Sequence, residues 1–220
     1  AYSSGSYTTN PYILLNYQGT LNDVSTLAHE LGHSMHSYYS RHNNPYQTSG
    51  YKIFVAEVAS TVNELLLAYY MLNNSKDDNE KLFILNRLME LFRTTTYRQT
   101  MFASFEKEIY DKSEKGEILT PDVMCDIYYN LNKKYFGNGV IVDDEIRYEW
   151  ERVPHFYYNF YVYKYATGLA SACFIVNRIL NGEEHAVLDY LEFLKTGGRD
   201  YPVEELKIAG VDISRKEVIE

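Results

Sequence analysis

The spacing of apolar positions along the chain predicts a mainly helical protein. Between residues 80 and 114 the apolar residues recur every three or four positions, which is the period of an α-helix. Similar patterns between glycine- and asparagine-rich turns predict helices over residues 22–39, 51–72, 121–136, 143–152, 165–180, 183–195 and 202–209. No internal repeat and no convincing linker interrupts them, so we expect a single domain over residues 1–220.

Local signals predict where some of these helices begin, bend or end. Asn22 or Asp23 is a suitable cap for the first helix, because a short polar side chain can accept hydrogen bonds from its first turn. Thr120 followed by Pro121 is a typical helix start. Three threonines at 94–96 predict a bend in the long helix, since β-branched residues are poorer helix formers.

The N-terminal residues have a different pattern. Residues 1–10 are small and polar, which favours a loop. The apolar run PYILLNY over residues 11–17 is short and follows a proline, so it predicts a strand. The expected fold is therefore mainly α, with a short N-terminal strand or a small sheet.

The charge and cysteine content exclude several classes of partner. The net charge is −9, from 21 basic and 30 acidic residues, and no basic stripe appears, so we expect no nucleic-acid partner. No uninterrupted apolar stretch reaches about 18 residues, so we expect no membrane-spanning segment and no membrane partner. The two cysteines, Cys125 and Cys173, form no CxxC pair, which favours a reducing, cytoplasmic location without a disulfide.

The stretch HELGH, residues 29–33, places two histidines four residues apart in the first predicted helix. Residues i and i+4 share a helix face, so His29 and His33 can bind one ion. Glu30 lies beside them, where it can deprotonate zinc-activated water instead of binding the metal. Such a pattern also arises by chance in roughly one chain in a few hundred of this length, so a helix that merely carries histidines is the alternative.

Gly32 lies inside the same predicted helix. A glycine there costs up to about 1 kcal/mol relative to alanine, because its backbone loses more freedom on folding. We therefore expect another backbone or a ligand to approach this helix closely at Gly32.

A catalytic zinc of this type needs a third protein ligand and keeps one position open. One arrangement places a third histidine six residues after the second, but Tyr39 stands there. The other uses a glutamate from a following helix, where Glu57, Ser60, Thr61 and Glu64 form a polar stripe among apolar residues. Buried carboxylates are costly unless paired or bound to metal, so one glutamate should bind the ion and the other should contact a ligand. The spacing leaves open which glutamate does which.

Four segments together resemble a known family: HELGHSMHSYY, FVAEVASTVNE, PHFYYNFYVYKYATG and FLKTGGRDYPVEELKIAGVD. They are similar to the oligoendopeptidase F branch of the thimet-oligopeptidase-like zinc metallopeptidases, and the resemblance extends over nearly the whole chain. It implies a zincin-type catalytic domain with one zinc ion, bound by His29, His33 and Glu57. It also implies that Glu30 is the general base. Glu64 is then the glutamate that contacts one of the zinc-binding side chains.

The aromatic segment 154–168 contains His155, five tyrosines and two phenylalanines. Most of these rings are typical of a packed aromatic core. Peptide hydrolysis also needs donors aimed at the charge that develops on the carbonyl oxygen, and tyrosine and histidine suit that task. The resemblance assigns it to His155 and Tyr163, and makes Tyr158 and Tyr161 candidates for substrate contact.

The resemblance implies a zinc endopeptidase that hydrolyses internal bonds of short peptides, because the family's deep channel excludes folded proteins. Family members are considerably longer, and their N-terminal helical half forms the opposite wall of that channel. The missing N-terminal half is then an expected partner. The alternative is a non-catalytic, zinc-stabilised helical peptide-binding module or an inactive fragment. A closed structural site needs a fourth ligand, for which His36 is the nearest but poorly placed candidate.

Overall fold

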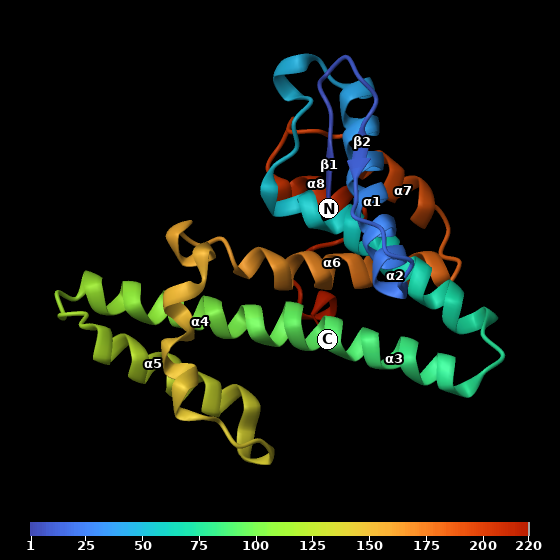
Figure 1. The fold of residues 1–220 in the computed structure, drawn as a ribbon. Coiled ribbons are helices and arrows are strands. Elements are labelled where there is room, and N and C mark those ends of the chain that lie inside the picture. The colour runs from blue at the N-terminus through green and yellow to red at the C-terminus, as the bar shows by residue number, and fades with distance from the viewer. Residues whose placement is uncertain (220) are drawn as a thin grey trace. The chain divides into compact units, whose positions relative to one another are not determined.

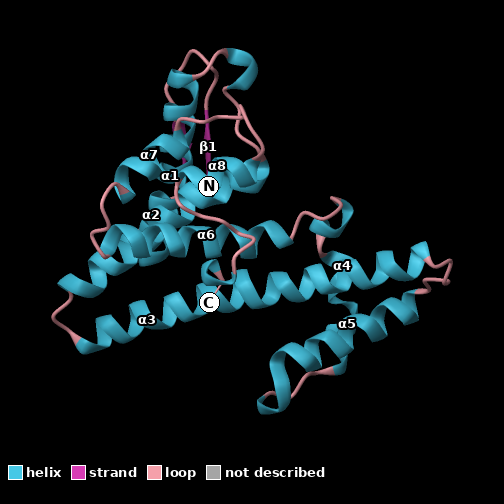
Figure 2. Cartoon of the chain, turned by 180° about the vertical axis from the view of Figure 1, so that it is seen from behind, coloured by secondary structure: helices cyan, strands magenta, loops and turns pink. Residues whose placement is uncertain are grey.

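The computed structural model describes residues 1–219 and is mainly helical, as the apolar spacing predicts (Figure 1). Figure 2 shows that strand structure is confined to one short pair in this part of the chain. The α-helices are α1 (Leu21–Asn43), α2 (Ile53–Asn74), α3 (Asp78–Phe92), α4 (Arg98–Glu114), α5 (Pro121–Phe136), α6 (Tyr163–Leu180), α7 (Ala186–Leu194) and α8 (Pro202–Ile208).

The chain forms two compact units. Unit 1 comprises residues 1–88 and 167–220, and unit 2 comprises residues 89–166. The expectation of a single catalytic domain over residues 1–220 stays a prediction.

Unit 1 is organised around α2, whose side chains are buried along much of its length. Its core combines fully or nearly fully buried residues of α2, α6 and α7: Val55, Val58, Val62, Leu65, Leu169, Ile175, Phe193 and Leu194. The β-branched and leucine-rich composition of α2 makes it apolar on most sides, so it is a central helix and not a surface one.

By length and composition alone, α2 is the one helix in the described part of the chain that could cross a membrane. A buried core helix passes the same test, and 44% of the apolar window of α2 is buried inside the protein. The feature is therefore weak evidence for a membrane span. The expectation that the chain has none stays a prediction.

Unit 2 is built on α4 and α5, which lie side by side (Figure 1). Its core is an aromatic and aliphatic cluster that also includes the residue before the aromatic segment and one residue within it: Met101, Phe102, Phe105, Ile127, Tyr128, Leu131, Val153 and Val162. The α5 helix begins as predicted, with Pro121 in its first turn and the Thr120 side chain accepting a hydrogen bond from the Val123 N–H.

Two local predictions on the N-terminal part of the chain are wrong in detail. The first helix is capped by Thr20, and not by Asn22 or Asp23. Asp23 is instead the reciprocal member of a capping box, because its carboxylate accepts the Thr20 N–H at 2.8 Å. The helix also continues beyond Tyr39, to Asn43.

The N-terminal loop prediction also fails in part. Tyr2–Ser4 forms strand β1, which pairs antiparallel with strand β2, Tyr12–Leu14, so the predicted strand exists but is shorter. Ser3 is held by a tertiary contact, a 2.8 Å hydrogen bond to the Ser34 hydroxyl of α1. A polar three-residue strand has no local signal, and only its partners stabilise it.

The threonine run lies in a change of helix type, while the bend predicted there stays a prediction. Arg93–Tyr97 forms a π-helix between α3 and α4. The Thr94 hydroxyl donates to the Glu90 carbonyl at 2.7 Å, a contact that competes with the regular hydrogen-bonding ladder. Residues 143–152, predicted as a short helix, form the 3₁₀ helix Asp144–Arg152.

The α1 and α2 helices of unit 1 pack closely where α1 carries Gly32. A Cβ atom on Gly32 would lie 2.5 Å from the Ser60 Cα and would also overlap the Ala59 carbonyl oxygen. The backbone of α2 occupies that space, so only glycine fits at this crossing. This confirms the predicted close approach.

Gly32→Ala is expected to destabilise the protein. The steric overlap involves backbone atoms that cannot rotate away, so the net loss should be about 1–3 kcal/mol despite the better helix propensity of alanine. Urea denaturation followed by circular dichroism measures it. Gly50→Ala is the matched control, because nothing lies within 4 Å of a Cβ there and its stability should stay within about 0.5 kcal/mol. Equal or greater stability of Gly32→Ala would contradict the close-packing argument.

Candidate metal centre

The α1 and α2 helices bring together two imidazoles and one carboxylate. His29 and His33 lie one turn apart on α1, and their Nε2 atoms are 3.1 Å apart. The Glu57 carboxylate of α2 lies 3.4 Å from the His29 Nε2 and 3.6 Å from the His33 Nε2. One ligand atom from each residue lies within 4.8 Å of the others, an arrangement that could hold a metal ion.

The two glutamates of the polar stripe on α2 have different contacts. Glu57 lies beside both Nε2 atoms, and its Oε2 accepts a 3.0 Å hydrogen bond from the Ser60 hydroxyl. Glu64 hydrogen bonds to the other ring nitrogen of His29, Nδ1. With the Nδ1 proton held by Glu64, the lone pair of the His29 Nε2 faces the Glu57 side of the cluster. The two glutamates, whose roles the spacing left open, thus contact different nitrogens of His29.

The electrostatics of the two histidines differ. Burial disfavours charge on His29, but the hydrogen bond and charge of Glu64, together with Glu57 and Glu30, raise its pKa above the ordinary value. Burial lowers the pKa of His33, and the charge of His29 lowers it further against the attraction of Glu57. A metal ligand must be a neutral imidazole, so the His33 environment favours the binding form.

Glu30 is nearly buried, with 6% of its surface exposed. Its Oε2 has no hydrogen-bond partner among the described protein atoms. The carboxylate is close enough to raise the pKa values of both His29 and His33. A buried carboxylate oxygen without a partner is costly unless water or substrate satisfies it, which suits a proton acceptor beside the cluster.

The α6 helix closes on α2 next to the carboxylate. Gly168 of α6 is buried, and a Cβ atom there would lie 3.6 Å from the Glu57 Cβ. Small residues at this position allow α6 to pack against the start of the polar stripe.

His36, the fourth-ligand candidate of the structural-zinc alternative, lies in a different environment. It is fully buried and stacks on Tyr51, with ring centroids 3.7 Å apart. Neither ring nitrogen has a hydrogen-bond partner among the described residues, and burial lowers its pKa to about 3. His36 is a packed core residue and does not join the three-residue cluster.

The aromatic candidates His155, Tyr158, Tyr161 and Tyr163 all belong to unit 2. The His155 ring stacks on Tyr161 at 5.5 Å, whereas the Tyr158 side chain is mostly exposed. The expectation that His155 and Tyr163 face the metal stays a prediction. Tyr165 was not among the residues that the sequence pointed to, and its hydroxyl lies 3.3 Å from the His155 Nε2. The alternation of tyrosines at 161, 163 and 165 was a signal for it, but an ambiguous one because the following residues are helical.

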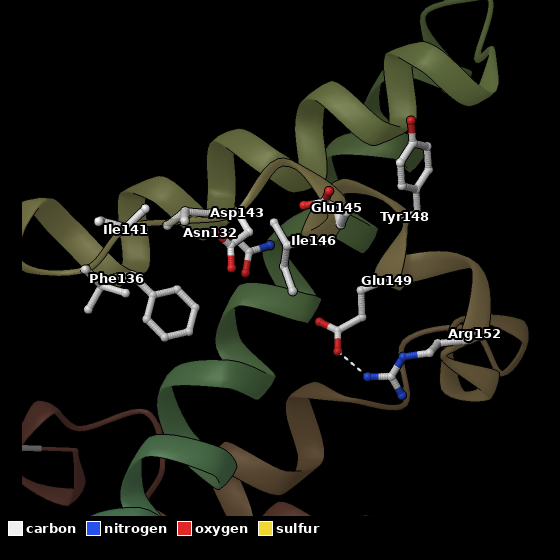
Figure 3. Close-up of a pocket in the computed structure, with 11 residues that line it drawn as sticks. Asn132, Phe136, Ile141, Asp143, Glu145, Ile146, Tyr148, Glu149 and Arg152 are labelled. Carbon is white, nitrogen blue, oxygen red and sulfur yellow. Dashed lines mark hydrogen bonds and ion pairs between the residues drawn. The ribbon is translucent and has the colours of Figure 1, made fainter.

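Unit 2 also contains an apolar pocket of about 590 Å³, shown in Figure 3. Its one strongly buried acid, Glu149, is engaged by Arg98, Arg152 and the Tyr128 hydroxyl. The arginines and this hydroxyl hold the pKa of Glu149 below its usual value against the effect of burial. A carboxylate whose negative charge is balanced by two arginines anchors the 3₁₀ helix Asp144–Arg152 and is not available for acid–base chemistry.

Comparison with known proteins gives matches over the whole chain. The family model described as "Peptidase family M3" matches residues 1–220. Oligopeptidase PepF of Bacillus subtilis is 54% identical over 220 residues, which cover 100% of this chain and 33% of the relative. The plasmid oligoendopeptidase F of Lactococcus lactis subsp. cremoris is 47% identical, with 100% and 37% covered.

A solved structure extends the likeness to three dimensions. The crystal structure of oligoendopeptidase-F from Enterococcus faecium matches with a TM-score of 0.81 and 44% identity, covering 90% of this chain and 36% of that one. The chain therefore spans about a third of the length of the curated relatives it matches.

The buried state of His36 predicts an acid-sensitive contribution to stability. Its pKa is about 3 in the folded protein and about 6.5 when unfolded, so the unfolded chain binds the extra proton as pH falls through that window. From pH 7 to pH 5 this costs the folded state about 2 kcal/mol, whereas above the unfolded value it costs nothing. His36→Phe should therefore lose less stability than the parent on this acidification, in urea melts with a chelator present. Parallel losses in both proteins would contradict the assignment of a neutral core histidine.

Proposed function

Because the chain belongs to peptidase family M3, we propose that it carries the zinc centre of a metalloendopeptidase that hydrolyses internal bonds of short peptides. The observation that carries the proposal is the meeting of His29, His33 and Glu57 at the crossing of α1 and α2. A two-histidine, one-carboxylate set with a neighbouring free glutamate is the donor set of a catalytic zinc with an open position.

In this proposal His29, His33 and Glu57 hold one zinc ion. Glu64 orients His29 through the Nδ1 proton, and Ser60 orients Glu57 through its hydroxyl. When bound, zinc supplies Lewis-acid chemistry, lowering the pKa of water and polarising a peptide carbonyl. The buried Gly32 crossing keeps the histidine and glutamate helices at a fixed separation.

Glu30 is the proton carrier of the proposed reaction. Its partnerless Oε2 accepts the proton of the attacking water and then delivers it to the leaving amine. His155 and Tyr163 donate hydrogen bonds to the charge that develops on the carbonyl oxygen, and Tyr158 and Tyr161 contact the peptide. These four aromatic assignments rest on the family resemblance.

The rest of the family architecture is a further part of the proposal. Since the chain covers about a third of its relatives, the proposed partner is the missing N-terminal half, and the proposed substrates are short peptides. The two free cysteines, Cys125 and Cys173, support a proposed cytoplasmic location.

Glu57→Gln should bind zinc far more weakly than the parent, because an amide is a poor zinc ligand. Competition against a chromogenic chelator measures the affinity. Glu64→Gln should lose only about 10–100-fold, since it alters the orientation of a ligand and not a ligand itself. Glu184, a highly exposed carboxylate, provides the matched control Glu184→Gln, which should bind as the parent does. Unchanged affinity in Glu57→Gln would refute the assignment.

Glu30→Gln should keep one zinc per chain but lose turnover. General-base catalysis typically contributes about 10²–10⁴-fold, and an amide cannot accept the proton. The measurement is cleavage of a fluorogenic peptide by the chain joined to the N-terminal half of a family member, with zinc content determined in parallel. Loss of zinc from Glu30→Gln would instead make Glu30 a ligand or a structural anchor.

The same joined protein tests the proposed function against the inert-module alternative. The chain with its N-terminal half should cleave short unstructured peptides but not folded proteins. A joined protein that is folded, holds zinc and cleaves no peptide would favour the non-catalytic module.

A further inference from the structure

A buried glutamate of α4 contacts the backbone of the aromatic segment. Glu106 is 2% exposed, and its Oε1 accepts a 2.6 Å hydrogen bond from the Phe160 N–H. Glu106 forms no ion pair with any of the described residues. Burial raises the pKa of its carboxyl, and only the bond from Phe160 opposes that rise. A buried carboxylate with a backbone N–H as its partner requires an explanation beyond core packing.

The residue held by this bond has an unfavourable backbone conformation. Phe160 has φ +54°, and it is one of two non-glycine residues with positive φ among the described residues. A bulky side chain in the left-handed region is strained, so surrounding contacts must hold the residue there. Phe160 is 49% exposed, so burial in the core does not hold the residue in this conformation.

A second residue of α4 contacts the same turn. Tyr110 lies four residues after Glu106, on the same helix face. Its hydroxyl donates to the Asn159 side chain at 2.8 Å, and its ring lies 4.9 Å from the Phe160 ring. Two side chains of one helix face therefore hold two consecutive residues of the aromatic segment.

The held turn lies next to the candidate substrate-contacting rings. Tyr161 follows Phe160 directly and stacks on His155. Tyr161 also packs edge-on against Tyr165, with centroids 5.6 Å apart, and the Tyr165 hydroxyl reaches the His155 Nε2. A change in the backbone at Phe160 would therefore reorient the Tyr161 side chain and alter the ring contacts that hold His155.

We propose that Glu106 is a positioning residue, which holds Phe160 in its left-handed conformation and thereby sets the orientation of Tyr161 and His155 toward a bound peptide. The hydrogen bond and the strained turn carry this inference, and its catalytic consequence rests on the function proposed above. Glu106 does not contact substrate. It acts through the turn at Asn159 and Phe160.

The first test measures the turn itself and needs no activity. Hydrogen–deuterium exchange is read at single amides in the parent chain, Glu106→Gln and Glu106→Met. The Phe160 amide should be protected in the parent and in Glu106→Gln, whose side-chain carbonyl still accepts the bond. It should lose protection in Glu106→Met, which has similar length but no acceptor oxygen. Glu108→Met, an exposed change on the same helix, is the matched control and should leave the Phe160 amide protected.

The second test measures peptide cleavage by the same variants joined to the N-terminal half. In Glu106→Met, kcat/KM should fall about 10–100-fold, because small displacements of positioning groups have effects of that size. KM should rise more than kcat falls, since the displaced tyrosines contact the peptide before it reacts. Zinc content should stay at one per chain. Glu106→Gln should restore near-parental kinetics, and a second change, Phe160→Gly, should recover part of the loss because glycine adopts this φ without strain.

The outcomes separate this proposal from the function on which it rests. Equal protection of the Phe160 amide in the parent and Glu106→Met overturns the proposal, as does lost protection with parental KM and kcat. If Glu106→Met does not fold, Tyr110→Phe removes only the bond to Asn159 and should show the same changes in smaller size. No change in that variant then overturns the proposal. A parent protein that cleaves no peptide contradicts the proposed function, while the exchange data still decide whether Glu106 holds the turn.

Discussion

Gly32 has no side chain, and the α2 backbone at Ala59 and Ser60 occupies the space where a side chain would lie. The contact brings the histidine face of α1 against the polar stripe of α2, so that Glu57 and Glu64 reach opposite nitrogens of His29. A wider helix separation would leave two carboxylates and two imidazoles without partners inside an apolar unit, which is energetically costly. The candidate metal centre thus depends on close backbone packing, which brings its proposed ligands together.

The four polar groups at that crossing form one coupled electrostatic system. The carboxylate of Glu64 favours a proton on His29, whereas burial and the neighbouring His29 charge disfavour one on His33. A bound cation would balance the carboxylates in place of a proton, so metal affinity at such a site would depend on pH. The charge of Glu30 also raises the pKa values of both histidines, but its Oε2 has no hydrogen-bond partner among the described residues and is therefore available to a water molecule or a substrate.

The chemistry of the chain is divided between its two units. Unit 1 holds the proposed metal ligands and the proposed base, and unit 2 holds the histidine and tyrosines proposed to act on the substrate. Within unit 2, two buried glutamates stabilise the structure through different contacts. The charge of Glu149 is balanced by ion pairs with arginines. Glu106 instead accepts one hydrogen bond from a backbone N–H and holds a strained turn. The single hydrogen bond to Glu106 lacks the opposite charge that an arginine supplies, but it is directional. It therefore fixes the backbone position of the aromatic segment.

The sequence by itself determined the helical class, the start of α5 and the pairing of His29 with His33, because these depend on local period and on residues one turn apart. It also indicated through Gly32 that something approaches α1, but not what. Only the tertiary structure decided that α2 makes that approach, that Glu64 bonds to the Nδ1 of His29, and that His36 stacks in the core. Strand β1 and the bond from Phe160 to Glu106 also had no local signal. Each joins residues far apart in the chain, and such contacts arise from packing, which no periodicity along the sequence encodes.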